Sequence, residues 1–376
     1  MKIGGVKPKR LVLIPSEMSS AHYIGTIFGK HCKKSQVFNI YISEICDNQY
    51  EKLGQIYDIK PNNPELNTLC GWWENEELKF SYNGEVYDCK YYDLIQNIFS
   101  RNTGILESGL MNSKCAFILG CGSVGSLVAL ELARAGVGKF VLVDNDILEY
   151  HNICRHQCGI SEVGEYKVDV LRNRILNINP RAEVESLIST IEMLNKPVFD
   201  RYCIQGETIL IGCADNRSAD VYANSIAVMY KVPFLSIGFW ERAFAGEIFY
   251  YLPNKGMPCY KCALGDGGDL SQRMSTNRRL YTNEEDLTKV NFEPGISVDI
   301  SFVTTVGIKL LLDIFNLDNP RYTARLLNTL TQYTLVCNTN NPKIGGEMAE
   351  IFGYPLQVTT SLQVNHGNGC PPCEFE

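Results

Sequence analysis

Residues 115–155 read CAFILGCGSVGSLVALELARAGVGKFVLVDNDILEYHNICR. The apolar run at 115–119 predicts a buried strand, and Gly120, Gly122 and Gly125 then form the pattern G-x-G-x-x-G ahead of an apolar helical repeat. In this pattern the first glycine permits a tight turn, the second lets a phosphate approach the backbone, and the third lets the helix pack on the strand. The N–H groups at the start of such a helix favour bound phosphate. The stretch therefore predicts a nucleotide-binding strand, loop and helix.

The polar residues after the second predicted strand indicate which nucleotide is bound. That strand ends at Asp144, close to the offset of about 20 residues at which an acidic residue binds ribose hydroxyls. The same pattern is typical of NAD-dependent dehydrogenases. However, Asp146, Asn152 and Arg155 follow within a short segment, and Lys167 lies on the next predicted helix. Because cations beside a phosphate loop suit a triphosphate better than a dinucleotide, we expect ATP, with NAD as the competing interpretation.

A later strand carries another acidic residue toward the same edge of the sheet. The apolar run 208–212 is followed by Cys213, Ala214 and Asp215. Ligands of open α/β sheets bind at the carboxyl ends of the strands, so we expect Asp215 to hold Mg²⁺ against the phosphates. Apolar strands alternate with helical patterns through this half of the chain. The pattern predicts an α/β, Rossmann-like, doubly wound and mostly parallel sheet.

Composition excludes several classes of protein. The chain has 376 residues, 45% of them hydrophobic, and a formal net charge of −7. Without a dense basic block it is not expected to bind nucleic acid. Since no apolar stretch approaches about 20 residues, and the N-terminus lacks a long apolar segment, we expect neither a membrane span nor a signal peptide. These observations predict a cytoplasmic protein with two domains, or with one large domain and an appendage.

Residues 1–100 differ from the rest and predict a small α+β or winged-helix-like module. We expect strands at 11–15 and 38–42, a helix at 21–28, and a hairpin within 72–88 that turns at Asn83-Gly84. The module is either a packing appendage or a clamp that binds a partner. Residues 101–376 form the second predicted domain. Within it, the polar segment 263–294 predicts a long crossover loop.

Four of the 15 cysteines form two C-x-x-C pairs. The first pair is Cys259 and Cys262, and the second is Cys370 and Cys373. Each stands beside Gly or Pro, as in the knuckles from which two thiolates reach one tetrahedral zinc. The alternatives are a redox pair or accidental spacing. We expect one structural Zn²⁺ that staples the C-terminal region.

These motifs resemble the ThiF/MoeB/HesA superfamily, the adenylating relatives of ubiquitin-activating enzymes. The resemblance runs from about residue 99 to residue 373. The residues that carry it are the three glycines of the loop, Asp144 and Asp146 as D-x-D, Asn152 and Arg155 followed by an altered His156-Gln157, Val163-Gly164-Glu165-Tyr166-Lys167 as V-G-x-x-K, and Asp215-Asn216 as D-N. The resemblance also implies a homodimer, because Arg101 matches an arginine that reaches into the partner subunit's ATP site in this family.

Two departures from the family pattern bear on function. Asp220 stands near a place where many members have arginine, and residues 263–294 contain no cysteine, although many members carry an acyl-accepting thiol there. The microcin-type peptide-adenylating enzymes lack that thiol too, and they also have an N-terminal clamp and a terminal C-x-x-C. If a thiol is used, Cys154 and Cys158 beside Arg155 are the fallback nucleophiles, because neighbouring positive charge lowers a thiol pKa.

The resemblance implies adenylation of the C-terminal carboxylate of a peptide or ubiquitin-like protein by ATP, with release of pyrophosphate. Arg155, Lys167 and Arg101 would offset phosphate charge, Asp215 would hold Mg²⁺, and Asp144 would orient the ribose. The aromatic residues Phe239, Trp240 and Phe244 could shape a groove for the tail or belong to the core. The alternatives are an activating enzyme that also forms a thioester, an NAD-dependent oxidoreductase, and a non-catalytic nucleotide-binding scaffold.

Overall fold

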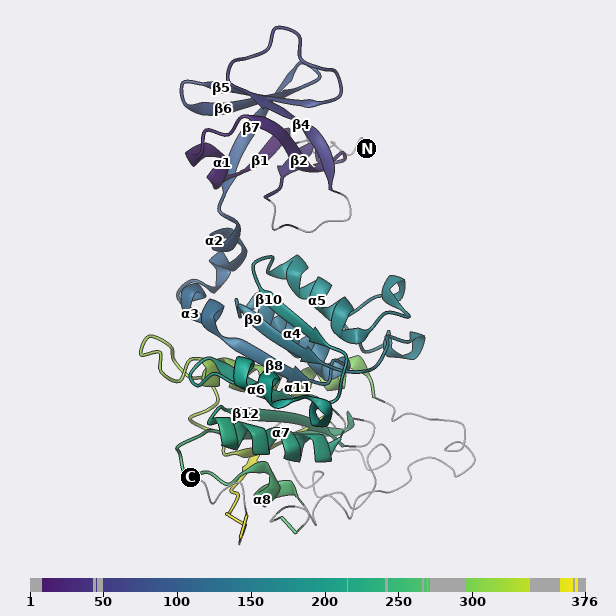
Figure 1. The fold of residues 1–376 in the computed structure, drawn as a ribbon, viewed down its shortest axis with the longest axis vertical. Coiled ribbons are helices and arrows are strands. Elements are labelled where there is room, and N and C mark those ends of the chain that lie inside the picture. The colour runs from purple at the N-terminus through teal and green to yellow at the C-terminus, as the bar shows by residue number, and fades with distance from the viewer. Residues whose placement is uncertain are drawn as a thin grey trace, which may run out of the picture. The chain divides into compact units, whose positions relative to one another are not determined.

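The computed structural model describes most of the chain in two compact units (Figure 1). The described residues are 9–42, 45, 50–214, 216–240, 243–265, 267–268, 270, 295–338, 359–367 and 369–370. The first unit comprises residues 1–101 with 179–181, and the second comprises residues 102–178 with 182–376. None of the described helices is both long enough and apolar enough to cross a membrane.

The first unit is a closed β-barrel with the strand order β1-β3-β2-β4-β5-β6-β7. Its strands are β1 (Leu11–Pro15), β2 (Gly25–Cys32), β3 (Val37–Ile40), β4 (Glu51–Tyr57), β5 (Leu69–Glu74), β6 (Glu77–Tyr82) and β7 (Glu85–Tyr92). Strand β1 runs parallel to both β3 and β7, and these two pairings close the barrel. Closure removes free sheet edges, and an apolar core that includes Val12, Ile14, Phe38 and Phe80 fills the inside.

The barrel corrects the prediction of a winged-helix-like module. The expected helix at 21–28 is wrong: a short helix, α1 (Ser16–Ser20), comes earlier, and β2 begins at Gly25. The alternating burial along β2 is strand-like, with Ile27 buried and Phe28 exposed. The hairpin at Asn83-Gly84 is confirmed, because both residues have positive φ and join β6 to β7.

The second unit is built on an eight-stranded sheet, counted over the described residues, with the order β10-β9-β8-β11-β12-β13-β14-β15. Its strands are β8 (Cys115–Leu119), β9 (Lys139–Val143), β10 (Glu183–Leu187), β11 (Thr208–Gly212), β12 (Phe234–Phe239), β13 (Ala245–Tyr251), β14 (Tyr333–Cys337) and β15 (Thr359–Leu362). The strands from β10 to β12 pair in parallel, and those from β12 to β15 pair antiparallel. The mixed α/β fold with a parallel sheet is therefore as predicted.

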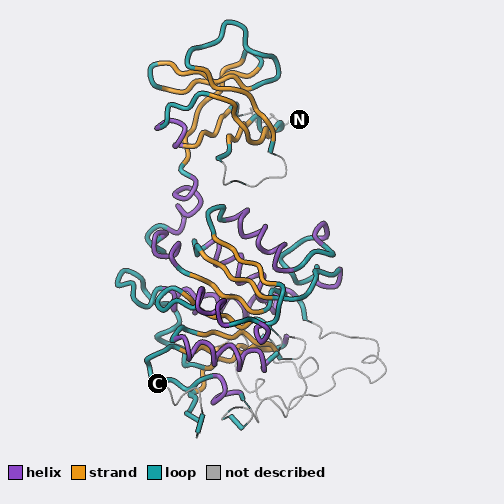
Figure 2. Tube along the Cα trace, in the orientation of Figure 1, coloured by secondary structure: helices purple, strands orange, loops and turns teal. Residues whose placement is uncertain are grey.

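Helices cover both faces of this sheet (Figure 2). One face carries α4 (Ser123–Arg134), α5 (Lys167–Ile178) and α11 (Ser297–Phe315), and the other carries α6 (Lys196–Tyr202), α7 (Arg217–Tyr230) and α8 (Tyr260–Leu264). Alternate strand residues enter opposite cores, as Phe117 and Ile118 do. The remaining short helices are α2 (Leu94–Phe99), η1 (Ser100–Asn102), α3 (Ser108–Ser113), η2 (Tyr150–Asn152), η3 (Ile160–Glu162) and η4 (Ile191–Met193).

A buried carboxylate binds the backbone that precedes β14. Asp313 on α11 is 1% exposed. Its oxygens accept hydrogen bonds from the Tyr322 hydroxyl at 2.6 Å and from the backbone N–H groups of residues 325–327 at 2.7–3.1 Å. These N–H groups satisfy the acid and are not free for a strand ladder, and residues 322–332 form neither helix nor strand.

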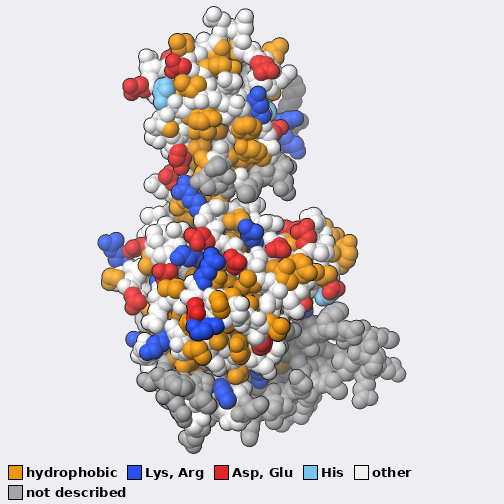
Figure 3. All heavy atoms as spheres, viewed as in Figure 1, with side chains coloured by type: hydrophobic (Ala, Val, Ile, Leu, Met, Phe, Trp, Pro, Cys, Tyr) orange, Lys and Arg blue, Asp and Glu red, His pale blue; other side chains and the backbone are white. Residues whose placement is uncertain are grey.

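Acidic and basic side chains are interspersed on the face drawn in Figure 3. The described residues of this face therefore carry charges of both signs.

Candidate nucleotide-binding site and cysteine cluster

The glycine loop has the geometry that a phosphate cradle needs. Gly120 has φ +89°, a conformation that favours glycine, and a Cβ on Gly125 would lie 1.9 Å from the Gly120 carbonyl oxygen. By contrast, a Cβ on Gly122 would meet nothing within 4 Å. Gly122 is also the N-cap of α4 and makes no side-chain cap. The first and third glycines thus permit close packing, whereas the second leaves open space in front of the helix N-terminus.

Asp144 organises this loop. One carboxylate oxygen accepts a hydrogen bond from the Cys121 N–H at 2.7 Å, and the other accepts from the Asp146 N–H at 2.8 Å. Hydrogen bonds to a charged acceptor are stronger than neutral ones, so the residue that we expect to orient the ribose also fixes the loop beneath the phosphates.

The D-x-D and V-G-x-x-K segments meet beside the loop. Lys167 Nζ lies 2.8 Å from Asp146 Oδ2, and the Lys167 N–H donates to the Asp146 carbonyl at 3.0 Å. The lysine side chain is 10% exposed and the aspartate side chain 64%. The Gly164 N–H donates to the Leu148 carbonyl at 2.8 Å, which pairs the two segments. This arrangement holds one cation at a fixed place close to the glycine loop.

Asn152 and Arg155 lie in the segment after Asp146, where Asn152 belongs to η2 and Arg155 reaches toward α11. Asn152 closes η2, because its side-chain oxygen accepts from the Glu149 N–H at 2.9 Å while the Glu149 side chain accepts from the Asn152 N–H. Arg155 is half-buried and reaches the start of α11: a Cβ on Gly295 would lie 3.6 Å from Arg155 Nη1. A nucleotide contact by either residue stays a prediction.

His156 is a residue of the site whose role sequence reasoning missed. It is 7% exposed, its Nε2 lies 2.8 Å from the Cys121 carbonyl, and its Nδ1 accepts from the Cys158 N–H at 3.1 Å. Accepting at Nδ1 leaves the proton on Nε2, so the neutral ring ties this segment to the glycine loop. Burial lowers the pKa of His156, which favours this neutral form. The only signal in the sequence was that His156-Gln157 departs from the family motif.

Cys158 is poorly suited to be the fallback nucleophile. It is buried, and burial together with the nearby Glu162 carboxylate raises the pKa of its thiol to about 12. A thiol of that kind is protonated at neutral pH and unreactive. Cys154 is exposed, and its Sγ lies 3.4 Å from the His151 carbonyl oxygen.

Asp220, the second departure from the family pattern, points into the protein. It is 4% exposed, and Ser236 Oγ donates to its Oδ2 at 2.5 Å. Its Oδ1 is buried without a hydrogen-bond partner among the described residues, against Gly212 of β11. Burial raises the pKa of Asp220 to about 7. The side chain is therefore not a surface charge facing the nucleotide.

We predict that Asp220→Asn removes a pH dependence of stability. The pKa of this carboxyl is about 3.9 in an unfolded chain and about 7 in the folded one. The stability that protonation of Asp220 contributes is fully present below pH 4, and it is lost as the pH rises through 7. Asparagine keeps the shape without the charge, so the variant should match the wild type at pH 4 and exceed it by up to about 4 kcal/mol at pH 8. Urea unfolding at several pH values measures this, and parallel pH profiles for the two proteins would contradict it.

Glu247 forms a second buried acidic centre nearby. Its Oε2 accepts from the Tyr333 hydroxyl at 2.7 Å and from Trp240 Nε1 at 3.1 Å, and Arg217 Nη2 lies 3.4 Å from Oε1. Trp240 packs edge-to-face on Phe244, which is 2% exposed. Phe244 therefore belongs to the core, whereas Trp240 is held by a hydrogen bond at the end of β12.

The proposed roles of two further site residues stay predictions. Asp215 lies outside the described residues, although its neighbour Ala214 packs on the glycine loop: a Cβ on Gly120 would lie 2.8 Å from the Ala214 nitrogen. Arg101 is exposed in η1 and belongs to the first unit. The structure brings Asp144, Asp146 and Lys167 together beside the loop, and their contacts with a nucleotide stay predictions.

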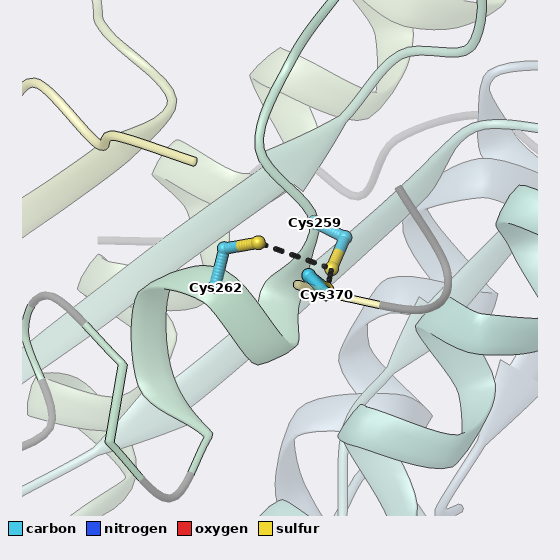
Figure 4. A group of neighbouring side chains, drawn as sticks. All are labelled: Cys259, Cys262 and Cys370. Carbon is cyan, nitrogen blue, oxygen red and sulfur yellow. Dashed lines mark hydrogen bonds between the residues drawn. The ribbon is translucent and has the colours of Figure 1, made fainter. Parts of the chain in front are cut away.

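The cysteine cluster contains three of the four predicted zinc ligands (Figure 4). The Sγ atoms of Cys259, Cys262 and Cys370 all lie within 4.8 Å of one another, with 3.7 Å between the first two and 3.3 Å between Cys259 and Cys370. Tetrahedral zinc at about 2.3 Å from each sulfur sets neighbouring sulfurs about 3.8 Å apart. The donor set therefore fits the metal. Cys373 lies outside the described residues.

Curated proteins that are similar to this chain include an activating enzyme and a dehydratase. Ubiquitin-like modifier-activating enzyme 5 of Caenorhabditis elegans is 27% identical over 181 residues, which cover 44% of this chain and 42% of that protein. The tRNA threonylcarbamoyladenosine dehydratase of Bacillus subtilis is 32% identical over 142 residues, which cover 37% of this chain and 55% of that protein. The chain thus matches roughly half the length of these curated relatives.

Solved structures of similar fold include Escherichia coli MccB. Its ATP complex has a TM-score of 0.52 at 18% identity, covering 74% of each chain, and its complex with MccA has a TM-score of 0.51 at 18% identity, covering 71% of this chain and 68% of that one. At this identity the likeness concerns the fold. The sequence profile of the ThiF family matches residues 102–346, a segment that includes the glycine loop, Asp144 and Lys167. This chain therefore belongs to the ThiF family.

Proposed function

We propose that this protein uses ATP to adenylate the C-terminal carboxylate of a peptide or ubiquitin-like protein and releases pyrophosphate. The observation that carries the proposal is the cradle at the start of α4: open space at Gly122, a loop fixed by Asp144, and Lys167 held beside it. Membership in the ThiF family supports the reaction class, and the MccB structures with ATP and with MccA support the two reactants.

The residues around the glycine loop have distinct roles in the proposed reaction. The carboxylate oxygen attacks the α-phosphorus, and the bond to the pyrophosphate oxygen breaks. Such a step depends on positioning and charge neutralisation rather than on covalent help from the protein. Lys167 and Arg155 offset the negative charge of the phosphates, and Asp144 accepts a hydrogen bond from a ribose hydroxyl. The N–H groups at the start of α4 bind phosphate oxygens.

Two metals belong to the proposal. Asp215 follows β11 directly after the residue that packs on Gly120, so a carboxylate there is suited to Mg²⁺, which neutralises phosphate charge when bound. The three clustered thiols, together with Cys373, would hold one Zn²⁺ with a closed tetrahedral shell, hence in a structural role. We also propose a cytoplasmic homodimer in which Arg101 of each copy serves the site of the other.

The test is ATP–pyrophosphate exchange, and any small protein or peptide encoded beside this gene is the first candidate partner to try. We expect exchange only when a cognate C-terminal tail is present, and none with Asp215→Ala, which removes the Mg²⁺ ligand and keeps the fold. Tight NAD binding without ATP binding would reject the proposal, and wild-type exchange in the variant would reject the Mg²⁺ assignment.

A thiol-labile adduct between enzyme and partner on a non-reducing gel would favour the thioester-forming alternative. Because residues 263–294 contain no cysteine, we expect adenylate without such an adduct.

A further inference from the structure

An ion pair between Arg217 and Glu247 lies at the carboxyl edge of the parallel strands. Arg217 is the first residue of α7, and its Nη2 lies 3.4 Å from Glu247 Oε1. Glu247 on β13 stands opposite Gly238, close to the end of β12. Because Gly238 has no side chain, the Glu247 carboxylate lies across β12: a Cβ on Gly238 would be 3.0 Å from Oε1. The carboxylate thus reaches from β13 to the start of α7.

Hydrogen bonds from inside the protein hold Glu247 in place. Its Oε2 accepts from the Tyr333 hydroxyl at 2.7 Å and from Trp240 Nε1 at 3.1 Å, and its side chain is only 7% exposed. A buried carboxylate with two donors on one oxygen has little freedom to move. It therefore holds the Arg217 guanidinium at a fixed place on the edge of the sheet.

The guanidinium of Arg217 is accessible to a ligand. The Arg217 side chain is 45% exposed, in contrast to that of Glu247. A guanidinium presents five N–H donors in a planar fork that matches the two oxygens of a carboxylate. The exposed part of the fork can therefore bind a second carboxylate alongside that of Glu247. Because the long side chain is already held, a ligand loses less binding free energy to the ordering of this arginine.

The position of the pair along the sheet determines which part of a bound tail it meets. Asp144 and Lys167, which we assign to the nucleotide, lie on the β9 side of the glycine loop, so the β12 side is left for the tail. The strand order is β8-β11-β12, and strands lie about 4.8 Å apart, so Gly238 is roughly 10 Å from β8. An extended chain covers this distance in about three residues.

We propose that Arg217 determines specificity by binding an acidic side chain about two to four residues before the C-terminus of the activated tail, and that Glu247 positions Arg217 for this contact. The inference rests on the proposed function, which supplies a tail that ends at the glycine loop. The contact is a binding step, so it needs neither ATP nor the formation of a bond.

The test uses a library of random dodecapeptides displayed with free C-termini and selected on the full-length protein without ATP. We expect enrichment of Asp or Glu two to four residues before the terminus. An enriched peptide is synthesised with this acid or with the matching amide, Asn or Gln, and both dissociation constants are measured by fluorescence polarisation. The amide peptide should bind the wild type about ten- to a hundredfold more weakly than the acid peptide.

Arg217→Gln should reduce this acid preference to within about threefold, because the charge that the acid contacts is gone. The double variant Arg217→Gln with Glu247→Gln should give the same result, and it leaves no buried charge unpaired if the single variant is unstable. Glu247→Gln alone should lower the acid preference and leave the affinity for the amide peptide unchanged, which a merely structural role would not do. The control is Arg201→Gln, at an exposed arginine on α6, and it should keep the wild-type preference.

Two results would overturn the inference: a selection without enriched Asp or Glu at these positions, or an acid preference that survives in both Arg217 variants. Equal weakening of the acid and amide peptides by Glu247→Gln would reject its positioning role. The enriched peptides are also assayed for ATP–pyrophosphate exchange. Exchange that is the same for acid and amide peptides would count against the inference alone, whereas acid-dependent binding without exchange would count against the adenylation proposal alone.

Discussion

Asp144→Ala should reduce partner-dependent ATP–pyrophosphate exchange by about a thousandfold. The carboxylate accepts two backbone hydrogen bonds, from Cys121 at 2.7 Å and from Asp146 at 2.8 Å. Hydrogen bonds to a charged group contribute roughly 1.5–3 kcal/mol each, and about 4 kcal/mol corresponds to a thousandfold. Alanine leaves both N–H groups without this acceptor and also removes the proposed ribose contact. Initial exchange rates at saturating partner measure the effect.

Glu183→Ala is the matched control. Glu183 is an exposed acid at the start of β10, at the opposite edge of the same sheet from the glycine loop. The control should retain wild-type exchange and unfold at the same temperature. If the exchange rate of Asp144→Ala lay within tenfold of the control rate and the variant bound ATP normally, two roles of Asp144 would be rejected. These are its role in fixing the glycine loop and its role in binding the ribose.

Cys262→Ser should release the proposed zinc and destabilise the second unit strongly. Its Sγ lies 3.7 Å from that of Cys259 in a buried cluster that joins α8 to the C-terminal segment. Structural zinc sites contribute about 10–16 kcal/mol of apparent binding free energy, so the loss of one thiolate should cost several kcal/mol of unfolding free energy. We expect close to one zinc per chain in the wild type and well under half in the variant, by elemental analysis.

Cys203→Ser provides the comparison. Cys203 is also buried, but it packs in the core outside the cluster. Its replacement should lower stability modestly and leave the zinc content unchanged. A wild-type protein without zinc, or a disulfide within the cluster, would refute the metal assignment.

Local pattern predicted the sheet of the second unit well. Strands β8 and β11 have the predicted bounds, because each is a buried apolar run. The barrel was harder to predict. Its closure depends on the pairing of β1 with β7, whose residues are more than 70 positions apart in sequence, and a single sequence carries no signal for such a pairing.

Prediction of the candidate site from the sequence was limited for a similar reason. The glycine loop and the Asp146–Lys167 pair follow from motifs with fixed spacing. His156 could not be predicted, since its bond to the Cys121 carbonyl joins segments 35 residues apart. Asp220 could be recognised as unusual, but only packing against Ser236 shows that it is buried.

The most direct test of the adenylation proposal follows one oxygen atom. The partner is prepared with ¹⁸O in its C-terminal carboxylate and incubated with enzyme, ATP and hydroxylamine, and the AMP is examined by mass spectrometry. If the carboxylate attacks the α-phosphorus, hydroxylamine then takes the acyl group and one ¹⁸O leaves in AMP. AMP that carries one ¹⁸O is the result we predict. AMP without the label, or ADP as the nucleotide product, would contradict the account.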